Sequence, residues 1–192
     1  MKITRLTPAD FKTVPWKNGQ GSTRELRFEN IEGSETFAWR LSMAPVVTDG
    51  VFSDFSGYDR KLLLVEGEGM TLCHDNGQVD VLSKQFDIAC FDGGWRTEAQ
   101  LHRGEILDFN VMTRQGVCRA VVDSFAEDGT HQVAVQAGCL LVYAVGSEIA
   151  IDSPGTDSIQ LAAGHLLEVR EPIENLWGIC GEGVICVQIN WD

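Results

Sequence analysis

The sequence predicts an all-β protein, and two features support this prediction. Short strand-like runs recur along the 192 residues, whereas long stretches with helical periodicity are nearly absent. Strong turn sequences, such as Asp75-Asn76-Gly77 and Ser153-Pro154-Gly155, separate the runs. Many short strands divided by such turns are typical of a β-sandwich or a β-barrel.

The individual strands follow from alternation of apolar and polar residues, or from short apolar runs between turns. We expect them at residues 22–28, 37–44, 60–66, 70–73, 85–91, 106–113, 118–124, 139–145, 149–151, 165–169 and 184–191. Residues 8–11 could open a short helix.

A faint internal repeat suggests two related halves. The apolar run at residues 62–72 is followed by a turn and another strand at 82–88, and the same order returns at 140–151 and 161–167. Each copy follows the layout of a cupin half, in which glycine turns let the strands pair into a small jelly-roll barrel. We therefore expect a bicupin. One barrel with a ligand pocket would span residues 1–115 and an apolar, filled barrel residues 116–192, with an exchange of strands between them left open.

The charge balance argues against two classes of partner. The chain has 15 basic and 28 acidic residues and a formal net charge of −13. A nucleic-acid-binding protein needs a basic face, and the sequence has no run of Lys or Arg. So negative a charge also disfavours anionic membranes. A small anionic ligand can still bind, provided that arginines cluster around it.

The cysteines and the start of the chain indicate a cellular compartment. The six cysteines form no C-x-x-C pair, which argues against zinc-ribbon and thioredoxin-like sites. No apolar leader follows Met1, and no apolar run approaches the ~20 residues of a membrane span. We expect a cytoplasmic protein with reduced thiols.

The most informative strand is the one at residues 108–114. Apolar Phe109 and Val111 alternate with polar Asp108 and Asn110. If the polar side faces water, this strand is an ordinary sheet surface. If it faces the inside of a barrel, its polar groups need partners or a ligand.

A cupin metal site is not expected in this sequence. A typical cupin enzyme holds its metal with a closely spaced His pair, a Glu and a later His. The four histidines here are far apart, and no H-x-H occurs. The strand that should bring the His pair carries Asp59-Arg60 instead, and a guanidinium repels a divalent cation. We expect neither a metal nor another cofactor.

Four longer motifs occur in the order that is typical of the HutD/Ves family of bacterial proteins. They are P-W-x-N-G-x-G-x-T-R-E at residues 15–25, W-R-x-S-x-A at 39–44, F-S-x-F-x-G-x-[DE]-R at 52–60 and D-F-N-x-M-x-R at 108–114. The chain resembles this family over residues 15–114, and more loosely to its end. One departure is Phe55-Ser56-Gly57, where many members have F-P-G.

The resemblance implies a bicupin that has no recognised metal site and is not known to be an enzyme. HutD members are encoded with histidine-degradation enzymes and are thought to sense a pathway metabolite and limit the pathway's output. Ves members are linked to cold and stress responses.

Arg60 is the expected anion anchor of the site. A guanidinium at the end of an apolar strand can donate two parallel hydrogen bonds to a carboxylate. That carboxylate belongs either to a ligand or to the protein itself, with Asp108 and Glu25 as the candidates. Asp108 and Asn110 are expected to orient Arg60 or a nearby ligand amide, or else only to satisfy the polar side of their own strand.

Four further residues are candidates for ligand contact. Arg40 faces opposite to its neighbours on its strand, as does Arg24, so either could line the pocket while the other makes a surface ion pair. Asn18 lies in a loop with two glycines, where it could both donate and accept hydrogen bonds. Trp16 could form a flat wall of the pocket or simply pack under that loop.

The leading functional hypothesis is a metal-free binding protein for a small carboxylate-bearing metabolite. The family resemblance suggests urocanate, or formyl- or formiminoglutamate, as the ligand, and modulation of histidine utilisation as the outcome, with another protein of the pathway as a candidate partner. One alternative is a metal-independent isomerase or lyase, with Asp108, Glu66 and Tyr58 as candidate acid–base groups. Another is a protein-interaction scaffold in a stress response.

Overall fold

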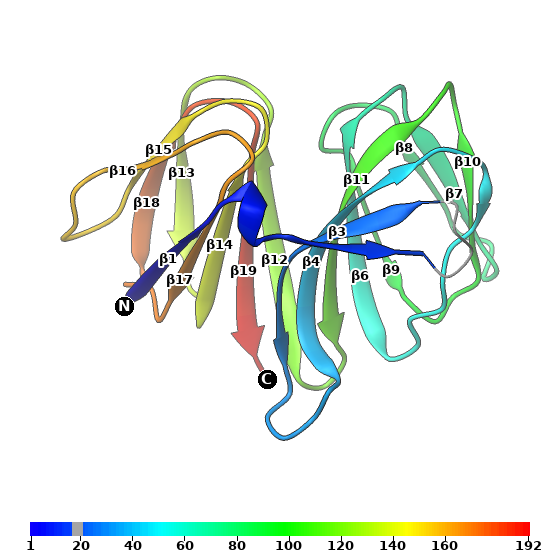
Figure 1. Cartoon of the computed structure of the whole chain (residues 1–192), viewed down its shortest axis with the longest axis horizontal. Coiled ribbons are helices and arrows are strands. Elements are labelled where there is room, and N and C mark those ends of the chain that lie inside the picture. Colours follow the sequence, from blue (N-terminus) through cyan, green and yellow to red (C-terminus); the bar gives the residue numbers. More distant parts are fainter. Residues whose placement is uncertain (17–20) are drawn as a thin grey trace. The chain divides into compact units, whose positions relative to one another are not determined.

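The computed structural model describes residues 1–16 and 21–192, and β-strands dominate it (Figure 1). Strands account for 60% of the chain and helices for 2%, which confirms the all-β class. The predicted helical turn is present as a 3-10 helix, η1, at Pro8–Asp10. Thr7 closes it at its N-terminus, since both its backbone N–H and its hydroxyl donate to Asp10 Oδ2 at 2.8 Å. No helix in the described residues is long and apolar enough to cross a membrane.

The chain divides into two compact units. One unit comprises residues 12–118, and the other comprises residues 1–11 and 119–192. Residues 1–11 belong with the C-terminal part because the first strand pairs antiparallel with a strand at residues 166–170. The predicted boundary between residues 115 and 116 stays a prediction.

Two sheets build the unit of residues 12–118. Along the six-stranded sheet the order is β2 (Lys12–Pro15), β3 (Ser22–Asn30), β4 (Phe37–Val46), β11 (Ile106–Arg114), β6 (Tyr58–Glu66) and β9 (Ile88–Asp92). Along the four-stranded sheet the order is β5 (Gly50–Val51), β10 (Thr97–Leu101), β7 (Met70–His74) and β8 (Val79–Leu82). A buried apolar cluster that includes Leu62, Leu64, Leu72 and Ala99 joins strands of both sheets.

The other unit is built in the same way. Its five-stranded sheet has the order β1 (Lys2–Leu6), β17 (Leu166–Arg170), β14 (Cys139–Ala144), β19 (Val184–Trp191) and β12 (Cys118–Phe125). Its four-stranded sheet has the order β13 (Thr130–Val135), β18 (Asn175–Cys180), β15 (Ile149–Asp152) and β16 (Ile159–Leu161). Its core contains Leu140, Val142, Leu167 and Trp177 and is apolar, as the sequence predicts.

The two units share a strand order. The order β4-β11-β6-β9 corresponds to β12-β19-β14-β17, and the order β5-β10-β7-β8 corresponds to β13-β18-β15-β16. The strands of the sequence repeat, β6 to β9 and β14 to β17, take equivalent places in the two sets. The repeat therefore reflects a shared connectivity, to which β2 and β3 are added in one unit and β1 in the other.

Several boundaries differ from the expected ones. Strands β1, β2, β5, β8, β10, β13, β16 and β18 were not expected. The strand expected at residues 85–91 begins only at Ile88, because Phe86 has a φ of +68° and Asp87 Oδ2 accepts hydrogen bonds from the N–H groups of Ser83 and Lys84. That turn occupies the residues before β9.

Candidate functional site

The candidate site lies on one face of the six-stranded sheet, where β4, β11 and β6 run side by side. Cross-strand partners share a face of an antiparallel sheet, and so do residues two apart on one strand. The register aligns three rows, in the order β4, β11, β6: Arg40–Met112–Arg60, Ser42–Asn110–Leu62 and Ala44–Asp108–Leu64. Arg40, Arg60, Asp108 and Asn110 therefore lie on the same face, which also carries the core residues Leu62 and Leu64.

Arg60 is buried among aromatic rings. Only 5% of it is exposed. Its guanidinium carbon lies 5.0 Å from the ring centroid of Phe91, 5.3 Å from that of Phe52 and 5.5 Å from that of Phe55. Such contacts stabilise a cation through the negative face of the ring, but they offer no hydrogen-bond acceptor.

Arg60 has no acidic partner in contact. Within residues 1–16 and 21–192, no carboxylate lies within ion-pair distance of it, and its buried Nε lacks a hydrogen-bond partner. Burial lowers the pKa of Arg60 to about 10, an effect that Asp108 opposes and Arg40 reinforces. The side chain thus stays charged at neutral pH and lacks a counter-ion in contact.

Arg40 extends the same cluster. Its guanidinium carbon lies 5.1 Å from the ring centroid of Phe37 and 5.2 Å from that of Phe55, so Phe55 contacts both arginines. Its Nη2 donates to Met112 Sδ at 3.6 Å, a weak bond. Its buried Nε has no hydrogen-bond partner in the part of the chain that the structure describes. Burial lowers the pKa of Arg40, whereas the charges of Glu25 and Tyr58 oppose that effect. We call these six residues the arginine–aromatic cluster: Arg40, Arg60, Phe37, Phe52, Phe55 and Phe91.

Asp108 and Asn110 supply buried acceptors on the same face. Asp108 is 4% exposed, and its Oδ1 accepts a hydrogen bond from the Ala44 N–H at 3.2 Å. Burial raises the pKa of Asp108 to about 7, against the opposing effects of Arg60 and the Ala44 N–H. Asn110 is 7% exposed, and its Oδ1 has no partner among the described residues.

The loop between β5 and β6 brings two of the rings to the arginines. The N–H of Phe52 donates to Thr97 O, and the N–H of Phe55 donates to Gly93 O, both at 2.9 Å. Between them, Asp54 Oδ1 accepts hydrogen bonds from the N–H and hydroxyl of Ser56. These bonds hold the loop against its own unit and keep the Phe55 ring close to both guanidinium groups.

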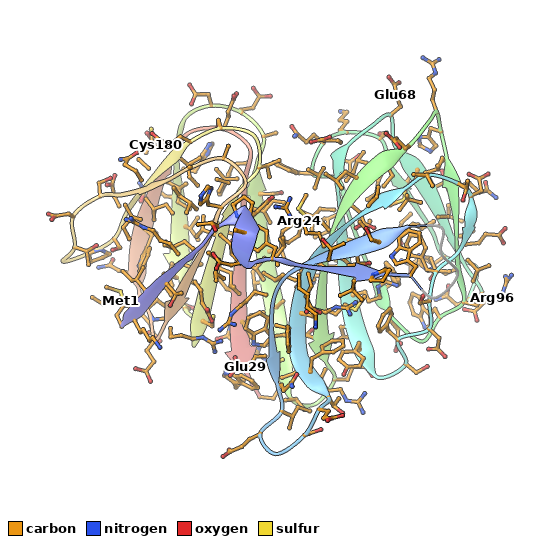
Figure 2. All side chains as sticks on the ribbon, viewed as in Figure 1. Met1, Arg24, Glu29, Glu68, Arg96 and Cys180 are labelled. Carbon is orange, nitrogen blue, oxygen red and sulfur yellow. The ribbon has the colours of Figure 1, made fainter. Side chains whose placement is uncertain are left out.

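The remaining predicted site residues lie as follows. The indole N–H of Trp16 donates to Thr23 Oγ1 at 2.8 Å, which ties the ring to β3. In the strand register, Arg24 is the partner of Met43 and Glu25 is the partner of Ser42. Ser42 shares a sheet face with Arg40, so Arg24, which is labelled in Figure 2, lies on the opposite face. Asn18 lies outside the described residues. The ligand roles of Trp16, Arg24 and Asn18 stay predictions.

Sequence reasoning missed the four phenylalanines of the arginine–aromatic cluster. The sequence marks Phe52 and Phe55 only as parts of a loop motif, and Phe37 and Phe91 only as strand residues. Glu25, which was considered only as an ion-pair partner, shares the face of Arg40 and acts on it through its charge. Phe52 and Phe55 of the F-S-x-F segment were a usable signal, because they lie eight and five residues before Arg60, which both rings contact.

The other two candidate acid–base groups are Tyr58 and Glu66. The hydroxyl of Tyr58 donates to Phe37 O at 3.0 Å. Glu66 is exposed, because a β-bulge at Leu107/Asp108 shifts the register so that Glu66 pairs with Leu107. Outside the four undescribed residues, no group of three His, Cys, Asp or Glu side chains is placed to hold a metal ion.

Comparison with known proteins identifies the relatives of this chain. Residues 8–186 match the HutD family. The chain belongs to the HutD family. A protein of Pseudomonas putida described as an uncharacterized 21.2 kDa protein in the hutC 3′ region is 33% identical over 97% of this chain and 96% of its own length. Protein Ves of Escherichia fergusonii is 36% identical over 59% of this chain and 60% of its own.

Solved structures extend the family match to the whole fold. A conserved protein of unknown function from Pseudomonas aeruginosa PAO1 is 31% identical, with a TM-score of 0.86 over 99% of this chain and 100% of that chain. HutD from Pseudomonas fluorescens SBW25, in a structure described as a formate condition, is 28% identical, with a TM-score of 0.84 over 100% of both chains. A bacterial pirin from Escherichia coli in complex with nickel(II) has a TM-score of 0.66 at 10% identity, over 97% of this chain and 98% of that one. Oxalate decarboxylase of Lactobacillus farciminis has a TM-score of 0.62 at 9% identity, over 96% of this HutD-family chain and 85% of that chain. These last two share the fold alone and mark it as cupin-like.

Proposed function

We propose that this HutD-family protein binds a small carboxylate-bearing metabolite at Arg60 and Arg40. The observation that carries the proposal is a buried, charged Arg60 with which no acidic side chain of the described residues is in contact. A buried charge without a partner costs free energy, and a ligand carboxylate that accepts from the guanidinium removes that cost.

The polar atoms without partners suggest the chemistry of the ligand. The Nε atoms of Arg40 and Arg60 are donors, which need an acceptor such as a carboxylate. The Oδ1 atom of Asn110 is an acceptor, which needs an N–H or O–H group. A molecule with a carboxylate at one end and a hydrogen-bond donor at the other would satisfy both needs.

The charges favour a ligand with one negative charge. Arg40 and Arg60 contribute two positive charges, Glu25 acts on Arg40 with a negative charge, and Asp108 contributes up to one more when it is ionised. With Asp108 protonated, one bound carboxylate brings the site close to neutrality.

The family gives the proposal a metabolic setting. Histidine utilisation is the association of its HutD members, and formate, named for the Pseudomonas fluorescens HutD structure, is the simplest carboxylate. Urocanate, formylglutamate and formiminoglutamate are the ligands that we propose. Binding would then modulate histidine utilisation in the cytoplasm, through contact with another protein of the pathway.

Calorimetry and thermal unfolding with formate and these three compounds test the proposal. A ligand at about 100 times its Kd should stabilise the protein by roughly 2.7 kcal/mol, which is readily seen in Tm. Loss of a buried charge-assisted contact should weaken binding at least about 30-fold in Arg60→Gln.

Arg96→Gln is the matched control. Arg96 also belongs to the unit of residues 12–118, but its side chain is 64% exposed, points outward (Figure 2) and lies 3.8 Å from Glu98. This variant should bind as the parent protein does. Absence of binding by all four compounds, or equal loss in both variants, would refute the proposal.

Asp108 supports a second candidate function, a metal-independent isomerase or lyase. A carboxyl group whose pKa lies at about 7 can both release and accept a proton at neutral pH. Incubation of each bound compound with the protein, followed by NMR, would reveal turnover. Asp108→Asn should abolish such turnover and retain binding; unchanged compounds after long incubation exclude this function for them.

We also propose that the two units are cupin barrels and that the chain is a bicupin. The support is their shared strand order, together with a cupin-like fold in distant relatives. If so, a fragment of residues 12–118, which ends at the first residue of β12, should fold on its own. An unfolded fragment, judged by amide dispersion in NMR, would count against two independent barrels.

A further inference from the structure

A buried histidine, His74, contacts Phe91 of the arginine–aromatic cluster. The side chain of His74, at the end of β7, is 0% exposed. Its ring centroid lies 4.9 Å from that of Phe91, and the Arg60 guanidinium carbon lies 5.0 Å from the same Phe91 centroid. His74 and Arg60 are therefore within about 10 Å of each other, with Phe91 touching both.

The partners of His74 suit both protonation states of its ring. Its Nε2 lies 2.9 Å from Asp80 Oδ2, and its Nδ1 lies 2.8 Å from Thr97 Oγ1, which in turn lies 3.3 Å from Trp95 O. In the neutral ring, Nε2–H donates to Asp80 and the Thr97 hydroxyl donates to Nδ1. In the protonated ring, Nδ1–H donates to Thr97, whose hydroxyl turns to the Trp95 carbonyl.

Both ring nitrogens of His74 and the Thr97 hydroxyl keep a hydrogen-bond partner in both protonation states. A proton can therefore be added to a fully buried ring by rotation of one hydroxyl group, without rearrangement of the backbone. Gln78 Nε2 also donates to Asp80 Oδ2 at 2.9 Å, which holds the carboxylate in place in both states.

We propose that His74 sets the affinity of the Arg60 site for its anion according to pH, with tighter binding when the histidine is protonated. This inference rests on the proposed binding function. Protonation adds one positive charge within about 10 Å of Arg60, in an interior that water screens poorly, and that charge attracts a bound carboxylate. Imidazole is the side chain that exchanges a proton near neutral pH.

The charged groups around His74 are few among the residues described. From β8 the ring contacts Asp80, and Arg60 on β6 contacts the same Phe91 ring as His74 does. The other neighbours do not change charge near neutral pH. They are Thr97 on β10, Phe91 on β9 and Trp95 in the loop before β10. Asp108 interacts with Arg60 through its charge and has a pKa raised to about 7 by burial, so its contribution to the pH dependence has to be removed separately.

The expected effect is about a threefold to tenfold difference in Kd between the two protonation states of His74, from a unit charge at about 10 Å in a medium of intermediate dielectric. Linkage requires the reverse effect to be equal, so the bound anion should raise the midpoint of His74 titration by about 0.5 to 1 pH unit.

The test is calorimetry with formate and urocanate between about pH 5.5 and about pH 8.5. It uses Asp108→Asn as the background, with and without His74→Gln. The background protein should bind more tightly at low pH, and His74→Gln should remove most of that dependence. His102→Gln is the control, since His102 is exposed, bonds Thr71 and belongs to the same unit. It should leave the profile unchanged.

NMR of the imidazole nitrogens in the unmodified protein provides a second readout that needs no variant of His74. The midpoint of its titration should rise on addition of formate, and should also rise in Arg60→Gln, which removes the facing positive charge. Carboxylate binding with the same pH profile in the presence and absence of His74, or a midpoint that ignores both changes, overturns this inference alone. If neither carboxylate binds at any pH, the proposed function fails and the inference fails with it.

Discussion

Replacement of Asp108 by Asn is expected to stabilise the protein above neutral pH. Asp108 is 4% exposed, and burial raises its pKa from 3.8 to about 7. Asparagine has nearly the same shape, can still accept the Ala44 N–H and cannot ionise. The variant therefore isolates the free energy of ionising a carboxyl group at this buried position.

The magnitude follows from linkage. Between the two pKa values, the folded protein retains a proton that the unfolded chain has released, so the free energy of unfolding falls as the pH rises from about 4 to about 7 and stays level above. At about 1.4 kcal/mol for each pH unit, the rise of the pKa from 3.8 to about 7 corresponds to at most about 4 kcal/mol. Asp108→Asn should raise the free energy of unfolding by roughly 1–4 kcal/mol at about pH 8 and leave it almost unchanged at about pH 4.5.

Urea unfolding of both proteins at these two pH values measures the effect. The difference between the midpoints should be large at the higher pH and close to zero at the lower pH, with unchanged m-values. An equal difference at both pH values, or a variant that is less stable at the higher pH, would refute a buried carboxyl group that titrates near neutrality.

Three further predictions concern packing around and away from the site. Gly93→Ala should destabilise the protein by about 1–3 kcal/mol and weaken ligand binding, because the new Cβ would lie 2.6 Å from the backbone O of Phe55. Urea unfolding measures the loss of stability, and calorimetry measures the loss of binding. Unaltered binding would contradict the role of Phe55. Phe55→Leu should cost about 1–2 kcal/mol, since the ring contacts both Arg40 and Arg60, and unfolding at high salt should still show the loss. Trp177→Ala should cost about 3–5 kcal/mol in unfolding, because the side chain is 0% exposed in the core of the other unit, whereas the Kd of the ligand should not change.

The buried central strands were predictable from the sequence, and the outer ones were not. Residues 37–44 and 106–113 carry enough apolar residues to mark β4 and β11 by pattern alone. Strand β10 (Thr97–Leu101) contains Glu98 and Gln100, and β1 (Lys2–Leu6) contains Lys2 and Arg5. These strands gain their stability from pairing with distant partners, which a local window of sequence does not contain.

The site was predicted in part for a similar reason. Alternation along one strand places Asp108 and Asn110 on a common side, but both sides of β11 are buried, so the question of which side faces water had no simple answer. The faces of Arg24 and Arg40 depend on register across β3 and β4, and a bulge between Glu25 and Arg27 interrupts it. The phenylalanines of the cluster come from a loop and from several strands, and only tertiary structure brings them together.

The pairing of β1 with β17 has a consequence for synthesis of the chain. Residues 2–6 leave the ribosome long before their partner strand, residues 166–170, is made. The unit of residues 12–118 can form while the first strand is still without its neighbour. Closure over so long a separation in sequence is slow, so attachment of the N-terminal segment should be among the last steps of folding. A tag or fusion placed before Met1 should slow this attachment more than one placed after Asp192.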